Sequence, residues 1–162
     1  MKVRKEFIRS MPIFSGLADN EIDLILSLTD EKKYPPGQVI VHEGDLGNLI
    51  YVIKEGEVLI EKARTQNGKP QPVTTLGQKD SFGEMSLIDP QPRAATVRAI
   101  SETTLITIST KALHDIYITK PETYVMILMN LARQMSRRLR KALEVIVELQ
   151  TGVREALPNL HI

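Results

Sequence analysis

The chain has 162 residues, of which 42% are hydrophobic and 25% are charged, and its formal net charge is +1. This length and composition predict a folded domain with a real core and exclude disorder as the main state. The lack of cysteine excludes a disulfide scaffold, an iron–sulfur cluster and a cysteine zinc site. The small net charge gives the whole molecule no bias toward nucleic acid or membrane.

The N-terminal segment, residues 1–28, is expected to be helical. Apolar residues recur there at helical spacing, at Ile22, Leu24, Ile25 and Leu28. Charged residues interrupt the first thirteen positions, so the segment is not a signal peptide. No stretch reaches the roughly 20 apolar residues that a membrane span needs. The sequence therefore predicts a cytoplasmic protein without a membrane span.

Residues 31–109 are expected to form many short strands, because β-branched runs alternate with glycine and proline turns. The runs on either side of Glu55-Gly56 are expected to pair as a hairpin. Further turns are expected at Pro35–Gly37 and at Asn67-Gly68. The expected strands are 38–42, 49–53, 58–60, 73–76, 95–100 and 104–108. Such spacing predicts a β-barrel or jelly roll, that is, a double-stranded β-helix.

Residues 110–150 are expected to form two helices, with Pro121 early in the second, and residues 151–162 a frayed tail. The second helix carries apolar residues alternately three and four apart, which makes a heptad seam. This seam can pack on the protein's own barrel or on a second copy, and we favour a homodimer. The seam consists of Val125, Leu128, Ala132, Met135, Leu139, Ala142, Ile146 and Leu149. The fold class expected is thus mainly β with flanking α, in a single domain of residues 1–162.

Residues 82–97 carry the clearest chemistry, reading Phe-Gly-Glu-Met-Ser-Leu-Ile and then, after a loop, Pro-Arg-Ala-Ala-Thr-Val. Gly83 allows close backbone approach, and residues 84–88 can form a helical turn whose first N–H groups bind an anion. The Arg93 guanidinium suits a phosphate, because its planar fork donates two charge-assisted hydrogen bonds. The Glu84 carboxylate can accept from two neighbouring sugar hydroxyls. These groups predict a nucleotide pocket.

This segment resembles the phosphate-binding cassette of cyclic nucleotide-binding domains, as found in protein kinase A regulatory subunits and catabolite activator proteins. The resemblance covers about residues 12–149 and includes Pro12–Leu17, Gly44 and Gly56. It implies a ligand-binding module and not an enzyme, with no cofactor.

The resemblance also assigns site residues. Glu84 is expected to bind the ribose 2′-hydroxyl, and Arg93 the cyclic phosphate. Backbone groups are expected to complete the phosphate site, at Gly83, Met85, Ser86, Ala94 and Ala95. Ligand binding in the barrel is then expected to reposition the C-terminal helices and signal to a downstream protein, which the sequence does not identify.

The expected ligand is cAMP, with cGMP as the alternative. Members of the family selective for cGMP often have threonine after the arginine, whereas this chain has Ala94, which offers no hydroxyl to guanine. Some catabolite activators place hydroxyl residues where this chain has Ala142 and Leu143. The base contact is therefore apolar, comes from elsewhere or is absent. The tail is too short for a winged helix-turn-helix, so no DNA-binding domain is expected.

A basic run in the long helix allows a different function. Arg133, Arg137, Arg138, Arg140 and Lys141 could form a nucleic-acid or lipid patch, but a solvated helix face is the interpretation we favour. The 4% aromatic content argues against a single-stranded nucleic-acid site.

Two further alternatives remain open. Glu84 and Arg93 could form a structural ion pair in a scaffold that binds no ligand and only dimerises. A cupin-type metal enzyme is the third hypothesis, but its metal needs clustered ligands, and the only histidines, His42, His114 and His161, show no metal-ligand spacing.

Overall fold

The computed structural model describes residues 5–63 and 70–156. It begins with three short helical elements, α1 (Lys5–Ser10), η1 (Pro12–Phe14) and α2 (Asp19–Ser27). Ile22 and Ile25 lie on the buried face of α2, as their helical spacing predicts. The helical N-terminal segment is thus confirmed for its described part.

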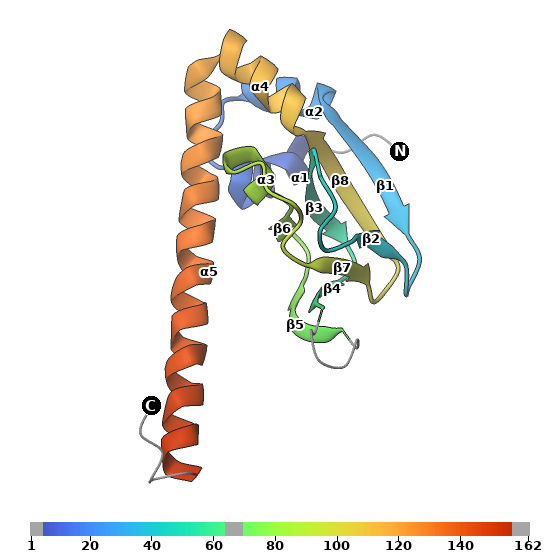
Figure 1. The fold of residues 1–162 in the computed structure, drawn as a ribbon. Helices are drawn as coiled ribbons and strands as arrows, with labels where there is room; N and C mark the ends of the chain where they lie inside the picture. The colour runs from blue at the N-terminus through green and yellow to red at the C-terminus, as the bar shows by residue number, and fades with distance from the viewer. Residues whose placement is uncertain (1–4, 64–69, 157–162) are drawn as a thin grey trace.

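In the described residues, eight strands form two four-stranded antiparallel sheets (Figure 1), which confirms the mainly β class with flanking helices. The strand order is β1-β8-β3-β6 in the first sheet and β2-β7-β4-β5 in the second. The first four strands are β1 (Thr29–Tyr34), β2 (Val39–Val41), β3 (Leu49–Glu55) and β4 (Val58–Lys62). The others are β5 (Gln71–Leu76), β6 (Ser81–Phe82), β7 (Thr96–Ala99) and β8 (Thr103–Ser109). This two-sheet jelly roll has two strands, β1 and β6, that the sequence did not predict.

The hairpin predicted around Glu55-Gly56 is wrong, because β3 and β4 belong to different sheets. β3 pairs with β6 and β8, whereas β4 pairs with β5 and β7. Gly56 has a φ of +85° and turns the chain from the first sheet into the second. β-branched runs identify strands but not their partners. The turn expected at Asn67-Gly68 lies outside the described residues.

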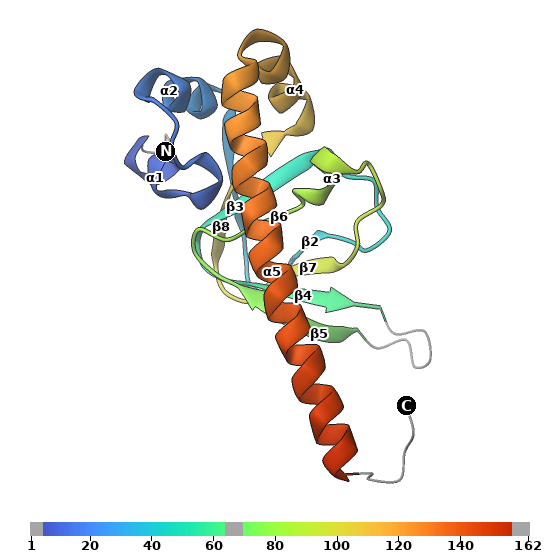
Figure 2. The same ribbon diagram turned by 90° about the vertical axis from the view of Figure 1, so that its left-hand side faces the viewer.

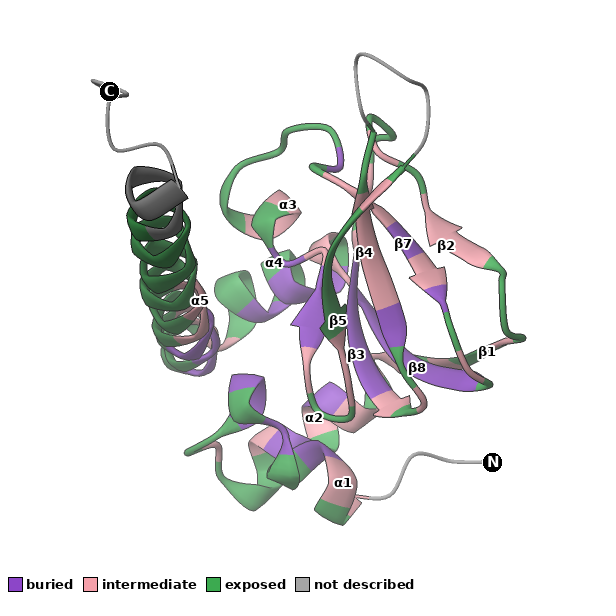
Figure 3. Cartoon of the chain, turned by 90° about the horizontal axis from the view of Figure 1, so that it is seen from below, coloured by how far each residue is buried: buried purple, intermediate pink, exposed green. Residues whose placement is uncertain are grey.

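β3 separates two parts of the hydrophobic core, because successive side chains of a strand point to opposite faces. Tyr51 and Ile53 face the second sheet and pack with Phe82 and Val97. The alternate residues of β3 belong to the larger cluster beneath the helices (Figure 3). The first sheet is therefore covered on both faces, which gives the site a rigid floor.

Two helices follow the sheets, α4 (Thr110–Thr119) and α5 (Pro121–Ala156). Ser109 caps α4 by accepting a hydrogen bond from the Ala112 amide at 3.0 Å. Pro121 is the first residue of α5, as predicted. The tail prediction is wrong for residues 151–156, which continue the helix through Gly152. One glycine costs a helix only about 1 kcal/mol, so it does not end one by itself.

The first half of α5 is fastened to the N-terminal helices. Ile127 and Leu131 are buried against them, and the Asn130 side-chain amide donates to the carbonyls of Ile13 at 3.2 Å and Ser15 at 2.8 Å. α5 then crosses the sheets and runs on beyond them (Figure 2). Every residue from 139 to 151 is exposed, so the second half has no neighbour in the described chain.

The heptad seam is not the face that α5 packs on its own domain. Val125 is 55% exposed, Leu139 62% and Leu149 65%. The seam's Leu128 and Met135 are half-buried. The protein's own domain therefore covers only part of this seam, at Leu128 and Met135. Within the described residues, no helix combines the length and the apolarity that crossing a membrane requires.

Candidate functional site

A cavity of about 340 Å³ lies between the second sheet and the segment 82–97. Its volume falls in the usual range of small-molecule sites. Aliphatic side chains of the second sheet form one wall, and four residues add charge to an otherwise largely apolar lining: Glu84, Asp89, Arg93 and Arg138. Every residue predicted for the ligand site lines it: Glu84 for the ribose, and Gly83, Met85, Ser86, Arg93, Ala94 and Ala95 for the phosphate. The structure therefore brings the predicted residues together around one cavity.

The local fold of this segment begins at β6. Phe82 pairs with Tyr51 across the sheet and stacks on its ring, with centroids 4.7 Å apart. Gly83 has a φ of +80°, and a Cβ there would collide with Arg93 and with the Leu49 carbonyl. The short helix α3 (Met85–Ile88) follows, as predicted. Gly83 is thus required both for the turn and for the close approach of the guanidinium.

Arg93 is buried, with only 7% of its surface exposed. Nη1 donates to the Gly83 carbonyl at 3.0 Å and to the Ser86 hydroxyl at 3.2 Å, and Nη2 donates to the Leu49 carbonyl at 2.7 Å. Among the described residues no carboxylate pairs with this guanidinium, and its Nε has no hydrogen-bond partner. Because a buried charge is costly unless it is paired, the site has an unmet demand for an anion.

Two residues complete the surroundings of the guanidinium. Its Cζ lies 5.8 Å from the centroid of the Tyr51 ring, within the range of a cation–π contact. Burial raises the pKa of Tyr51, and the charge of Arg93 opposes that rise. The backbone of Gly47 lies so close that a Cβ there would overlap the guanidinium. Arg93 is therefore held by the rigid sheet and its loops.

Glu84 is also buried, at 4% exposure, but a different element holds it. Its Oε1 accepts a hydrogen bond from Arg138 Nη1 at 2.6 Å, and its Oε2 has no partner among the described residues. Burial raises the pKa of Glu84, while the charges of Arg138 and Arg93 act to lower it. The ion pair considered between Glu84 and Arg93 is not formed, since the partner of Glu84 is Arg138.

Arg138 was predicted to lie on a solvated face of the long helix, and for this residue the prediction is wrong. Its guanidinium extends from α5 into the cavity lining, where Nη1 donates to Glu84 and Nη2 donates to the Ser81 carbonyl at 2.5 Å. One turn earlier, Gln134 accepts from the Ser81 hydroxyl at 2.9 Å. α5 therefore reaches the cavity through polar side chains.

A sequence signal for Arg138 existed beside the heptad seam. Ile127, Leu131, Gln134 and Arg138 follow one another at spacings of four, three and four, which places them on one helix face. This helix face is apolar at its start and polar at its end. Such a pattern indicates that the first residues pack in the core and that the last ones lie at the edge of a polar site.

The positions where some relatives place hydroxyl residues do not reach the cavity. Ala142 and Leu143 are exposed, and neither lines it. The second sheet instead contributes the aliphatic residues Val41, Ile60 and Leu76 and the hydroxyl residue Thr74. A flat, largely apolar ring fits such a wall better than a charged group does.

The described residues show no metal centre. No three histidine, aspartate or glutamate side chains lie together there in a way that could hold an ion. His114 lies on α4 beside Tyr117, and His42 lies just after β2. His161 is outside the described residues. The described structure thus lends no support to a metal enzyme of the cupin type.

Comparison with known proteins identifies the family to which the chain belongs. The profile of the cyclic nucleotide-binding domain matches residues 31–120. The chain is 33% identical to the cyclic AMP receptor protein of Thermus thermophilus over 83% of its own length and 60% of that protein. It is 33% identical to the cAMP-dependent protein kinase regulatory subunit of Hypocrea atroviridis, over 68% of this chain and 23% of that one. The chain therefore spans less than two thirds of either relative.

A solved structure shows the same fold. A cyclic nucleotide-binding domain from Methylobacillus flagellatus superimposes with a TM-score of 0.79 at 26% identity, covering 88% of this chain and 80% of that one. The superposition covers 88% of this chain, so the likeness extends beyond the matched residues 31–120.

Proposed function

The chain belongs to the cyclic nucleotide-binding domain family, and from this premise we propose that it is a receptor for a cyclic nucleotide, with cAMP as the preferred ligand. The observation that carries the proposal is the buried Arg93 guanidinium, which lines the cavity without a carboxylate partner among the described residues. A cyclic phosphate would supply the missing anion. No catalytic step is assigned to the site.

In this proposal Arg93 binds the phosphate with the donors it still has free. A guanidinium carries five N–H groups, and three hydrogen bonds to the protein leave two for the ligand. Backbone amides of Gly83, Met85, Ser86, Ala94 and Ala95 lie around the same cavity and would share the remaining phosphate oxygens.

Glu84 binds the ribose through the oxygen that the protein leaves unused. Its Oε2 is buried and unpartnered in the described part of the chain, while Arg138 holds Oε1. A ribose 2′-hydroxyl that donates to Oε2 would satisfy this atom. The ligand then completes a chain of contacts from the sugar through Glu84 to α5.

The preference for cAMP rests on Ala94 and on the aliphatic wall. Ala94 offers no hydroxyl to a guanine, and Val41, Ile60 and Leu76 offer no polar group to either base. Both purines can lie against such a wall, so we expect cGMP to bind more weakly but detectably.

We propose that ligand binding is transmitted through α5, and that the chain forms a homodimer through this helix. The seam residues Val125, Leu139, Ile146 and Leu149 are exposed although they repeat at the period of a coiled coil. Two copies of the helix would cover them. Ligand-dependent repositioning of α4 and α5 then alters this interface for a downstream protein.

Isothermal titration of the purified chain with cAMP, and separately with cGMP, tests the receptor assignment. Saturable binding that is tighter for cAMP supports it. Absence of binding of both, after removal of any copurified nucleotide, overturns it in favour of a ligand-free scaffold.

Sedimentation of the wild-type chain and of Leu139→Glu tests the dimer. We expect the wild type to sediment as a dimer and the variant as a monomer, because a buried carboxylate in the apolar seam would destabilise the contact between the two helices. Glu144→Lys, a charge change at an exposed α5 position outside the seam, is the control and should remain dimeric.

A further inference from the structure

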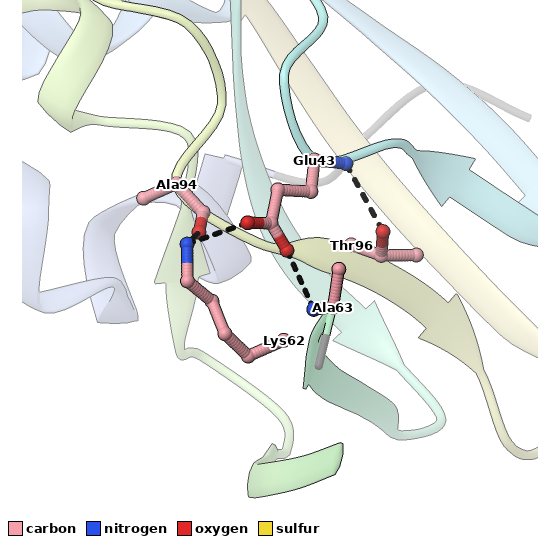
Figure 4. A network of polar contacts seen from close by, with 5 residues as sticks. All are labelled: Glu43, Lys62, Ala63, Ala94 and Thr96. Carbon is pink, nitrogen blue, oxygen red and sulfur yellow. Dashed lines mark hydrogen bonds and ion pairs between the residues drawn. The ribbon is translucent and has the colours of Figure 1, made fainter. Parts of the chain in front are cut away.

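A polar network beside the cavity joins three parts of the chain (Figure 4), and of its five residues only Ala94 lines the cavity. The Lys62 ammonium, at the end of β4, lies 2.6 Å from Glu43 Oε1 and donates to the Ala94 carbonyl at 2.6 Å. Glu43 Oε2 accepts from the Ala63 amide at 2.7 Å, and the Glu43 amide donates to the Thr96 hydroxyl at 3.0 Å. The turn after β2, the end of β4 and the start of β7 are thereby held together.

The contact with the Ala94 carbonyl fixes the direction of the next amide. In a trans peptide unit the C=O and the following N–H point in opposite directions, and the described chain contains no cis peptide bond. Lys62 holds the Ala94 carbonyl from outside the cavity, so the Ala95 N–H points the opposite way. Ala94 and Ala95 both line the cavity, and the opposite way is toward it.

The preceding peptide unit is held in the same manner. The Gly44 amide donates to the Arg93 carbonyl at 2.9 Å. This contact comes from the backbone of the turn that also carries Glu43. Two successive carbonyls of the segment are therefore engaged, one by the turn after β2 and one by the end of β4.

Lys62 would act through this carbonyl and not as a charge at the ligand. Its side chain is 54% exposed, so solvent and salt screen its direct attraction to a phosphate. A hydrogen bond to a carbonyl polarises the peptide unit and strengthens its N–H as a donor. The Ala63 amide and Lys62 lower the pKa of the Glu43 carboxyl, which keeps it ionised as the partner of Lys62 at neutral pH.

We propose that Lys62 is a positioning residue for the phosphate end of the cavity: held by Glu43, it orients the Ala95 amide by binding the Ala94 carbonyl. This inference rests on the proposed function, because the anion that the Ala95 amide binds is the phosphate of the proposed ligand. Most exposed ion pairs contribute little to stability. The Lys62–Glu43 pair differs because the same ammonium also donates to the backbone carbonyl of Ala94 in the binding segment.

The test uses the full chain labelled with ¹⁵N-alanine, so that the Ala94 and Ala95 amide resonances can be followed during titration with cAMP. In the wild type we expect the Ala95 proton to move downfield as it binds the phosphate. Lys62→Met should reduce that shift by at least half and weaken binding about fivefold, as expected for loss of one hydrogen bond. Lys62→Arg should restore both, because arginine can also donate to the carbonyl.

Lys111→Met is the matched control, because Lys111 forms an exposed ion pair with Asp115 on α4, away from the cavity. It should leave affinity and the Ala95 shift unchanged. If the wild type binds and Lys62→Met shows the same affinity and the same Ala95 shift, the inference is overturned and the receptor assignment stands. If the wild type binds no cyclic nucleotide, the receptor assignment itself fails, and the inference fails with it.

Discussion

The two buried charges of the cavity are held by different parts of the molecule. Arg93 is bound by carbonyls of β3 and of the turn at Gly83, all within the sheet framework. Glu84 is bound by Arg138, which comes from α5. One end of the site is therefore independent of the long helix, and the other end depends on it.

This difference separates two tasks. The phosphate end can bind with a preformed geometry, since nothing that holds it has to move. In the proposed complex the ribose end would share the Glu84 carboxylate between ligand and helix, so a ribose hydroxyl bound to Glu84 would change the hydrogen bonding and charge that Arg138 meets. Affinity is expected to come mainly from the Arg93 end and coupling mainly from the Glu84 end, because a ligand shifts a conformational equilibrium only by contacts that differ between the states.

Removing the guanidinium gives the sharpest test of this division. Arg93→Ala should weaken cAMP binding by about 1.5–3 kcal/mol, or roughly tenfold to 150-fold, because a charged hydrogen-bond donor is lost. Titration calorimetry measures the change. Arg98→Ala is the control, because Arg98 lies five residues further along on β7, pairs with Glu61 and does not line the cavity; this variant should bind normally. Equal affinity of Arg93→Ala and the wild type would refute the assignment of the phosphate end.

Neutralising the ribose end should separate binding from stability. Glu84→Gln should weaken cAMP binding about tenfold, because a carboxylate is a stronger acceptor than an amide. The variant should nevertheless melt at a higher temperature than the wild type at pH 7. Burial raises the pKa of Glu84 above its ordinary value of 4.5, so ionisation is more costly in the folded chain than in the unfolded one.

The sign of the pH dependence follows from that shift. Well below pH 4.5 the carboxyl is neutral in both states, and the variant and the wild type should melt alike. Between pH 4.5 and the elevated pKa the wild type loses stability relative to the variant, and above that pKa the difference stays constant. Glu31→Gln, which breaks the ion pair with Lys54, should show no such gain. A lower melting temperature of Glu84→Gln at every pH would contradict the account.

Crowding Arg93 from behind should disturb the phosphate end alone. The Cβ of Gly47→Ala would overlap the guanidinium and displace it from its carbonyl partners. We expect about fivefold weaker cAMP binding, with the exchange behaviour of α5 unchanged. Gly77→Ala is the control, because a Cβ there meets nothing within 4 Å. Normal cAMP binding by Gly47→Ala would show that the Arg93 side chain can shift without loss of affinity, which would contradict a rigid phosphate end.

Cutting the link to the helix should have the smallest effect on affinity. Arg138→Ala leaves Arg93 intact, so cAMP binding should change by no more than about threefold. Ligand-induced changes in hydrogen exchange along α5 should disappear, while they persist in the control Arg137→Ala, whose side chain is exposed. Unaltered exchange changes in Arg138→Ala would show that coupling takes another route.

The binding segment could be predicted because its chemistry is local. Gly83, Glu84 and Arg93 lie within eleven residues, and the turn and short helix between them follow from the same stretch. The two-sheet class was also predictable from spaced turns and β-branched runs. The pairing of β3 and β4 was not, because both the adjacent and the crossed connection satisfy the same alternation.

Arg138 escaped prediction for a different reason. It stands among four other basic residues, and only the position of the helix relative to the sheets distinguishes it from them. That position depends on the burial of Ile127 and Leu131 and on the side-chain amide of Asn130, which are long-range contacts. Helical spacing defines a face but not what the face meets.

The free half of α5 also has a mechanical meaning. At 1.5 Å per residue its 36 residues extend about 54 Å, and the part beyond Asn130 measures about 39 Å. If the helix pivots at Asn130, Arg138 lies about 12 Å from the pivot and the far end about 39 Å from it. A tilt of about 5° would then move Arg138 by about 1 Å and the far end by roughly 3 Å. A displacement of about 1 Å beside the cavity would thus become about three times larger at the end of α5, where a partner helix could follow it.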